Sequence, residues 1–427
     1  MKCRNCNKPL NNKILSIPAQ PISSVFLKKK IKNLIEYPLD LYECNFCKLI
    51  QFKKLAPLGD MYGSTYGYRT SLSKLMVDHI KTKFEIIKKN NFVKNNDKIL
   101  DIGCNDGTFL NLFAKLNLKK LSLYGVDPSA EKFKKYYNSK IQLIIDFFSV
   151  KLANNLIKSK LKNKFKLITS FAMFYDIEDP NGFCKSIDLL LHDNGKWISE
   201  FSYFPLLLQN LTYDQICHEH VTYYTLSTFK KIIEQNNLII QDISFNEING
   251  GSIEVSCIKK SSRIKVNHKK IKKVLESEKT INKNSYEELQ KRINNVKYIL
   301  NLLLKNINRN DIIGYGASTK GNIVLNHCEI SNKQIKYICD SNEEKHGKFT
   351  PGSNIEIISK EKMRKIKPKY LLVLIWSFRK EVIKQELEYI KNGGTLILHL
   401  PVLHIVNKEN YKQFIKDDFK AFSYNTN

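Results

Sequence analysis

Hydrophobic and polar positions follow two rhythms along the chain, and each rhythm predicts a type of element. Residues 71–89 (SLSKLMVDHIKTKFEIIKK) carry apolar side chains at helical spacing, which predicts an amphipathic helix. From residue 98 onward, short apolar runs typical of strands alternate with helical stretches. The predicted strands are KILDIGC (98–104), SLYGVDPS (122–129), KLITSFAMF (166–174), GKWISEFS (195–202) and VSCIKK (255–260). Strands separated by helices predict an α/β fold with a parallel, doubly wound sheet.

The same alternation begins again at residue 311. Its strand-like runs lie in DIIGYGASTKGN (311–322), YICDSN (337–342), KYLLVLIW (369–376) and GTLILHLP (394–401). They predict a second, smaller Rossmann-like sheet. Residues 264–308 are charged and helical, and their heptad run is too short for a coiled coil, so we expect a helical connector packed on its neighbours. Residues 1 to about 60 are punctuated by Cys and Pro and predict a small β-rich module.

Composition narrows the class of protein. The 427 residues suffice for two or three domains. The formal net charge of +29 rests on dispersed lysines, which codon bias explains better than a polyanion partner, although a basic surface would still attract a small anionic substrate. Residues 1–6 contain a cysteine pair and do not resemble a secretory signal. No apolar run approaches the roughly 20 residues that span a bilayer. We therefore expect a cytoplasmic protein that binds no membrane, with a monomer as the default.

Four of the ten cysteines form two CxxC pairs, Cys3–Cys6 and Cys44–Cys47. Two residues between thiolates let both sulfurs reach one ion, and four thiolates complete a tetrahedral Zn²⁺ site. Four unpaired cysteines in a reducing compartment are the alternative, because disulfides are disfavoured without export. Since protein sulfurs fill all four positions, the predicted zinc is structural rather than catalytic.

A glycine turn follows the strand that ends at Asp101. Its candidate ligand-binding residues are Gly103, Asn105, Asp106 and Gly107. In dinucleotide enzymes such a turn faces a diphosphate, which Asp101 and Asp106 would repel. Carboxylates suit the ammonium and sulfonium centres of S-adenosylmethionine instead, and Asp127 at the next strand tip can accept hydrogen bonds from ribose hydroxyls. The alternative is an α/β domain whose glycine turn binds no cofactor.

The second glycine turn has the opposite charge. Gly314, Gly316 and Gly321 fit a strand–turn–helix phosphate cradle, no acid lies within the loop, and Lys320 adds a positive charge. This turn suits a diphosphate, whereas the first does not. The alternative is a Rossmann-like domain that binds no nucleotide and only packs against the rest of the chain.

Together these motifs resemble a known family, the zinc-knuckle S-adenosylmethionine-dependent sugar C-methyltransferases. The resemblance runs from Cys3 to about Val406 and rests on the cysteine pairs and on TYGYRTSLS (65–73), DIGCNDGTFL (101–110), YDQICHEHVTYYTL (213–226), NGGS (249–252), GYGASTKGN (314–322) and the PG at 351–352. It implies four parts: a zinc-binding module (1–62), a class I methyltransferase domain (63–263), the helical connector (264–308) and a Rossmann-like nucleotide-sugar-binding domain (309–427).

The family resemblance also implies a reaction. A methyl group would pass to the carbon next to the ketone, C3, of a dTDP- or similar NDP-4-keto-deoxysugar. Carried onto CHEHVTYY (217–224), it implies His220 as the general base and Glu219 as a polar partner. Tyr68 of TYGYRTS would reach the active site, with Tyr66 close behind. The implied contacts to the nucleotide-sugar come from the second glycine turn, through Gly314, Gly316, Lys320 and Asn322.

This chain departs from the commoner family pattern at three places. Cys217 stands where many members have Tyr, and Asn249 stands where His is usual; both become candidate substrate contacts. MFYDIEDP (173–180) replaces a segment that often holds His. His218 and His220 could instead be packing residues, and Tyr66 and Tyr68 could pack between the zinc module and the core. A metal bound by HEH is disfavoured, because adjacent residues point to different sides of a strand or helix.

Other functions remain open at this stage. O- or N-methylation of a related sugar is the nearest alternative, given Cys217. A nucleic-acid binder would fit the charge and the zinc knuckle, but interleaved Arg/aromatic patches are missing, so we expect no nucleic-acid partner. NAD-dependent oxidoreduction is the third alternative.

Overall fold

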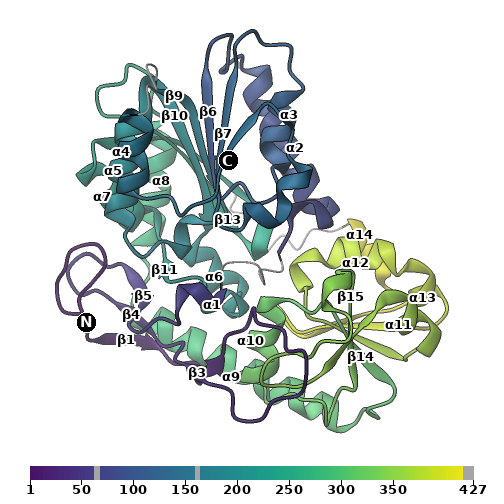
Figure 1. Ribbon diagram of the computed structural model, residues 1–427. Helices are drawn as coiled ribbons and strands as arrows, with labels where there is room; N and C mark the ends of the chain where they lie inside the picture. The colour runs from purple at the N-terminus through teal and green to yellow at the C-terminus, as the bar shows by residue number, and fades with distance from the viewer. Residues whose placement is uncertain (62–67, 159–163, 417–427) are drawn as a thin grey trace.

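The computed structural model describes residues 1–61, 68–158 and 164–416. Figure 1 shows a large sheet with helices on both faces at the top, a smaller sheet at the lower right, and the N-terminal module at the lower left. The predicted α/β architecture is confirmed: the chain has a central, mostly parallel sheet, an N-terminal cysteine-bearing module and a C-terminal Rossmann-like sheet.

The central sheet has seven strands. In spatial order they are β12 (Leu238–Asn246), β13 (Ser252–Lys259), β10 (Leu191–Ser202), β9 (Phe165–Phe171), β6 (Lys98–Ile102), β7 (Ser122–Val126) and β8 (Ile141–Ile144). The run from β10 to β8 is parallel, as predicted. β12 and β13 are antiparallel, because a short turn joins them and two strands joined in this way run in opposite directions.

Helices cover both faces of this sheet (Figure 1). One face carries α2 (Lys74–Lys89) and α3 (Thr108–Ala114), and the other carries α4 (Val150–Lys158), α5 (Pro180–Leu190), α7 (Leu226–Gln235) and α8 (His268–Glu278). The helix predicted over residues 71–89 therefore starts at Lys74, where the Ser73 side chain accepts a hydrogen bond from Met76 N. The apolar core has one cluster on each face of the sheet, one with residues of α2 and α3 and the other with residues of α4, α5, α7 and α8.

One strand of the N-terminal sheet comes from the central part of the chain. Its sheet has the order β1 (Asn12–Leu15), β4 (Leu41–Glu43), β5 (Ile50–Phe52) and β11 (Thr222–Tyr223). A small separate pair is formed by β2 (Gln20–Pro21) and β3 (Glu36–Tyr37). Because β11 directly follows the CHEH segment, pairing with β5 holds that segment against the module.

The C-terminal sheet has six strands and a Rossmann order. In spatial order they are β16 (Glu356–Ser359), β15 (Tyr337–Asp340), β14 (Ile312–Tyr315), β17 (Tyr370–Val373), β18 (Thr395–Leu398) and β19 (His404–Val406). β19 alone is antiparallel to its neighbour. The helices of this part are α10 (Thr319–His327), α11 (Lys360–Ile366), α12 (Arg379–Gln385), α13 (Leu387–Lys391) and α14 (Tyr411–Lys416).

The remaining helices join the parts. α8, the first helix of the predicted connector, packs on β12 and α7. The second connector helix, α9 (Lys283–Lys305), contacts β1 and α6 (Phe204–Asn210), and α1 (Leu58–Met61) ends the N-terminal module. Among the described helices, none combines the length and apolar character that a membrane crossing needs.

Candidate active site

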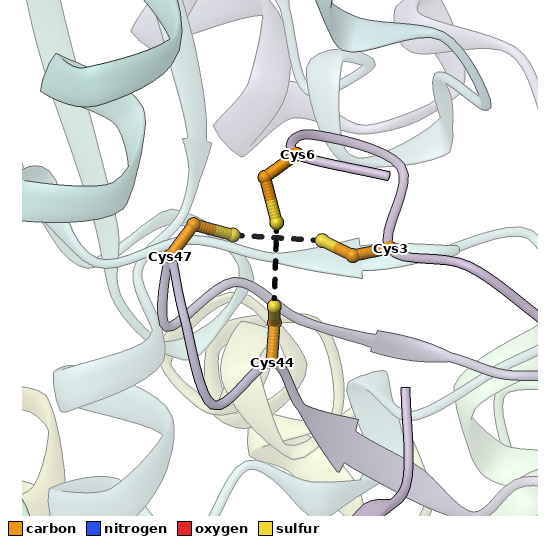
Figure 2. Close-up of side chains that lie close together, drawn as sticks. All are labelled: Cys3, Cys6, Cys44 and Cys47. Atoms are coloured by element: carbon orange, nitrogen blue, oxygen red, sulfur yellow. Dashed lines mark hydrogen bonds between the residues drawn. The ribbon is translucent and has the colours of Figure 1, made fainter. Parts of the chain in front are cut away.

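The zinc centre lies at one end of the N-terminal module. All four cysteine sulfurs lie within 4.8 Å of one another, and the Sγ–Sγ distances are 3.5 Å for Cys3–Cys47 and 3.5 Å for Cys6–Cys44 (Figure 2). Tetrahedral Zn–S bonds of about 2.3 Å would separate the sulfurs by roughly 3.8 Å. The four sulfurs therefore fit a structural zinc ion, and Gln51 Nε2 supports the site by donating to Cys3 Sγ at 3.1 Å.

One cavity of about 720 Å³ connects the central sheet with the C-terminal sheet. The ends of β6 and β7 line one part of it, with Asp101, Gly103 and Asp127. The CHEH segment lines the middle, and residues that follow β14 and β15 line the other part. The two glycine turns recognised in the sequence therefore open into the same space.

The part of the cavity at β6 and β7 is acidic. Asp127 accepts hydrogen bonds from Asn105 N at 2.9 Å and from Ser129 N at 2.7 Å, which holds its carboxylate at the tip of β7. Asp101 accepts a hydrogen bond from Thr169 Oγ1 at 2.7 Å. Burial, reinforced by the charge of Asp127, raises the pKa of Asp101 to about 7. A ligand with a positive charge would relieve this unfavourable pairing of carboxylates, so the site fits the cationic S-adenosylmethionine.

The glycine turn itself divides into lining and supporting residues. Gly103 has a φ of +74° and lines the cavity; a Cβ there would lie 3.0 Å from Met173 Cγ. Asp106, by contrast, accepts hydrogen bonds from Ser71 N at 3.0 Å and from Thr108 Oγ1 at 2.6 Å. At Gly107 a Cβ would lie 2.7 Å from the Tyr137 ring. Asp106 and Gly107 thus shape the turn rather than line the cavity.

Asn105 connects this turn to the segment that contains Tyr68. Its Oδ1 accepts a hydrogen bond from Thr70 N at 2.9 Å, and its Nδ2 donates to Tyr68 O at 3.2 Å. The Tyr68 side chain lines the cavity and is 46% exposed. Tyr66 lies outside the described residues.

In the CHEH segment, three side chains face the cavity and one faces the N-terminal module. Cys217, Glu219 and His220 line the cavity, whereas His218 Nδ1 lies 3.4 Å from Ser23 Oγ of the N-terminal module. The ring of His220 packs on Tyr175, with 4.0 Å between centroids. The two histidines therefore do not share a metal-binding face.

The protonation of this segment follows from its burial. Burial, together with the charge of Lys320, lowers the pKa of His220 to about 3, so its imidazole is neutral at neutral pH. Burial also raises the pKa of Glu219. Among the described residues, Glu219 Oε2 has no hydrogen-bond partner, although it is buried. Such an atom normally finds a partner, and a bound ligand would supply one.

In the second glycine turn, the glycines serve close packing. A Cβ at Gly314 would lie 2.6 Å from Ile338 Cγ1, and one at Gly316, whose φ is +91°, would lie 2.6 Å from Ile375 Cγ2. Asn322 is buried and donates to Ser23 O at 2.7 Å, which ties α10 to the N-terminal module. The cavity lining from this turn consists of Ser318, Thr319 and Lys320.

The side chain of Lys320 contacts a residue of the central domain. Its Nζ donates to Asn249 Oδ1 at 2.8 Å, and Asn249 lies in the turn between β12 and β13 with a left-handed φ of 58°. Asn249 and Lys320, which the sequence placed in separate motifs, are therefore in contact at the cavity.

Sequence reasoning left some lining residues without a role. Asp214 is buried in the same segment as the CHEH residues and accepts a hydrogen bond from Trp376 Nε1 at 2.9 Å. Lys345 and Lys360 also line the cavity, on the side of the C-terminal sheet. Asp214 lay inside the quoted motif YDQICHEH, but no spacing rule separates these lysines from the many others in the chain.

Known proteins match the chain in three consecutive parts. Residues 3–62 match a family model described as "Putative zinc binding domain", residues 68–242 match "Methyltransferase domain", and residues 247–401 match "C-methyltransferase C-terminal domain". C-methyltransferase NovU of Streptomyces niveus is 25% identical over 378 residues, which cover 88% of this chain and 89% of NovU.

Solved methyltransferase structures match less than half of the chain. A S-adenosylmethionine-dependent methyltransferase of Clostridium acetobutylicum ATCC 824 is 16% identical with a TM-score of 0.32, covering 42% of this chain and 90% of that one. The PH0226 protein of Pyrococcus horikoshii OT3 is 18% identical with a TM-score of 0.35, covering 45% of this chain and 94% of that one.

The family models and NovU agree with the zinc centre and the cavity described above. The zinc-binding, methyltransferase and C-methyltransferase C-terminal models follow one another along the sequence, and NovU is similar over nearly its whole length. The chain is thus an S-adenosylmethionine-dependent methyltransferase with a zinc-binding module, and the resemblance to the zinc-knuckle sugar C-methyltransferases predicted from its motifs is confirmed.

Proposed function

We propose that this enzyme transfers a methyl group to a carbon, C3, of an NDP-4-keto-deoxysugar in glycan or natural-product sugar biosynthesis. The observation that supports this most is the shared cavity. It has an acidic part at Asp101 and Asp127, a buried histidine and glutamate in the middle, and a part lined by lysines at the C-terminal sheet. A cationic methyl donor and an anionic acceptor would therefore meet near His220.

At the acidic part, Asp101, Gly103, Asn105 and Asp127 would hold S-adenosylmethionine. When bound, this cofactor supplies a methyl group on a positively charged sulfur, which a carbanion-like carbon can take. The two carboxylates suit the positive charges, and they would repel the diphosphate of NAD. In this proposal Asp106 and Gly107 act indirectly, by holding the shape of the turn.

At the other part, the nucleotide-sugar would lie against the C-terminal sheet. Lys345 donates to Ala317 O at 2.7 Å and lies 4.8 Å from the centre of the Phe26 ring, so its charge is held at the end of β14. Lys360 is held by Gln385 Oε1 at 2.7 Å. Two fixed lysines are appropriate for a diphosphate. Gly314, Gly316 and Asn322 would support the turn that carries these contacts.

Within the middle part, His220 would act as the base. Removing the proton next to a ketone needs an unprotonated base, and the imidazole of His220 is neutral at neutral pH. Glu219, whose Oε2 lacks a partner among the described residues, would hydrogen-bond the sugar near the reacting carbon, and Tyr68 would add a hydroxyl group at the cofactor side.

Cys217 favours one alternative, O- or N-methylation of a nucleotide-linked sugar. Its thiol is a weaker hydrogen-bond donor than a tyrosine hydroxyl, so it would assist enolate formation less. Methylation of a hydroxyl or amine needs a base but no enolate.

A product assay separates these reactions. The enzyme is incubated with methyl-labelled S-adenosylmethionine and a panel of NDP-4-keto sugars, and the product is analysed by NMR. A label on a sugar carbon supports the proposal, and a label on oxygen or nitrogen supports the alternative. Cofactor binding without transfer to any member of the panel would exclude this acceptor class.

We also propose that the enzyme works as a monomer in the cytoplasm, and that it binds neither nucleic acid nor membranes. Binding that saturates with the nucleotide-sugar supports this proposal. Salt-sensitive binding to random oligonucleotides would contradict it, despite the net charge of +29.

A further inference from the structure

Lys320 is a half-buried cation whose ammonium group contacts a residue outside its own glycine turn. It is the second residue of α10 in the C-terminal domain, but its Nζ donates to Asn249 Oδ1 of the central domain at 2.8 Å. Lys345 and Lys360, in contrast, have hydrogen-bond partners in the C-terminal domain itself, Ala317 O and Gln385 Oε1. The positive charge of Lys320 therefore lies among the residues of the reaction centre.

Acidic side chains line the same cavity as this ammonium group. The carboxylates of Asp214, Asp176 and Glu219 all favour its charged form and oppose the effect of burial, which lowers the pKa of Lys320. Lys320 in turn contributes to the lowered pKa of His220. The geometry agrees, because Asn249, the partner of Lys320, accepts a hydrogen bond at its backbone oxygen from Gln215 Nε2, two residues before Cys217, and both Lys320 and His220 line the cavity.

The ammonium group has donors left for a ligand. It carries three N–H groups, and among the described residues the hydrogen bond to Asn249 is the one that Lys320 makes. A carbonyl oxygen of a bound substrate could accept another. The thiol of Cys217, which lines the same region, is a much weaker donor for this purpose.

We propose that Lys320 stabilises the negative charge that forms on the ketone oxygen of the acceptor, and that it does not hold the diphosphate. This inference rests on the proposed function. His220 takes the proton from the carbon next to the ketone, the C–H electron pair forms the C=C bond, and the carbonyl pair moves to the oxygen. The oxygen becomes an enolate next to the Lys320 ammonium, which keeps its proton throughout. Asn249 is a positioning residue, because it orients Nζ.

The test uses a partial reaction that needs no methyl transfer. In D₂O, with S-adenosylhomocysteine present, the wild-type enzyme should exchange the proton next to the ketone of an NDP-4-keto sugar, as seen by NMR. Lys320→Gln removes the charge but can still donate to Asn249. It should slow both exchange and kcat by about 100- to 1,000-fold, the usual cost of losing one oxyanion donor. The Kd for the free nucleoside diphosphate should change less than about twofold.

Controls separate this role from others. Lys297→Gln removes a lysine whose partner is Glu329, at 2.6 Å, and should leave exchange unchanged. Lys320→Met serves as a second variant, and unchanged melting temperature and cofactor affinity show that each variant is folded. Weaker binding of the nucleoside diphosphate with unchanged exchange would overturn the inference and assign Lys320 to the diphosphate. Exchange at the wild-type rate in both Lys320 variants would also overturn it. If the wild-type enzyme neither exchanges nor methylates any keto sugar, it is the proposed function that fails.

Discussion

The pKa of Asp101 predicts that cofactor affinity depends on pH. Near neutrality the buried carboxyl group is partly protonated, since its pKa is about 7. An ammonium group bound next to it stabilises the ionised form, so binding must release the proton that is still present. Affinity should therefore increase as the pH rises, and protons should be released on binding.

The size of this effect follows from the pKa. With a pKa of about 7, roughly one-eleventh of the Asp101 carboxyl groups is ionised at pH 6, and roughly ten-elevenths at pH 8. If only the ionised form binds, the affinity rises about tenfold, which corresponds to about 1.4 kcal/mol. Cys104 and Tyr137 also lie close to Asp101, but burial raises the pKa of both groups, so neither should titrate in this range.

Isothermal titration calorimetry with S-adenosylhomocysteine can measure this dependence, using buffers of different ionisation enthalpy to count protons. Asp101→Asn should bind more weakly at pH 8 and show a flat profile. Asp78→Asn, on the exposed face of α2, should keep the wild-type profile. A flat wild-type profile between pH 6 and 8, or a sloping one in Asp101→Asn, would refute the reasoning.

Three further predictions concern catalysis and stability. His220→Ala should abolish turnover but leave cofactor affinity nearly unchanged; an equal loss of both would indicate a structural role. Cys44→Ser, or zinc removal by a chelator, should lower both the melting temperature and the activity, because β11 is attached to the zinc-bearing sheet; an unaffected melting temperature at zero zinc content would contradict this. Burial alone would raise the pKa of Glu200, but Lys83 and His79 lie against its carboxylate and lower that pKa to about 2, well below the ordinary value of 4.5. Its stabilisation of roughly 3 kcal/mol should be present above pH 4.5 and lost as the pH falls towards 2, and Glu200→Gln should flatten this part of the urea-unfolding profile.

Local patterns in the sequence determined several features without the fold. Two CxxC pairs predicted the cysteine cluster, since ligand spacing is a local property. The alternation of strands and helices predicted two α/β sheets, because burial of each strand depends on its own run of apolar residues. It did not predict β12, or that the short turn after it makes β13 antiparallel. It also could not show that residues 222–223 complete the sheet of the N-terminal module, since such pairing joins distant parts of the chain.

Only the tertiary structure decided which motif residues face the cavity. Gly103 and Lys320 line it, whereas Asp106 and Asn322 of the same two motifs hold neighbouring segments in place. Spacing along the chain determines which residues share a turn, but the direction of each side chain depends on what packs against that turn. Lys320 shows this most clearly, because its partner Asn249 is 71 residues away and belongs to the other sheet. The sequence by itself determined which reactive side chains this enzyme has. The packing of its parts decided which of those side chains line one cavity.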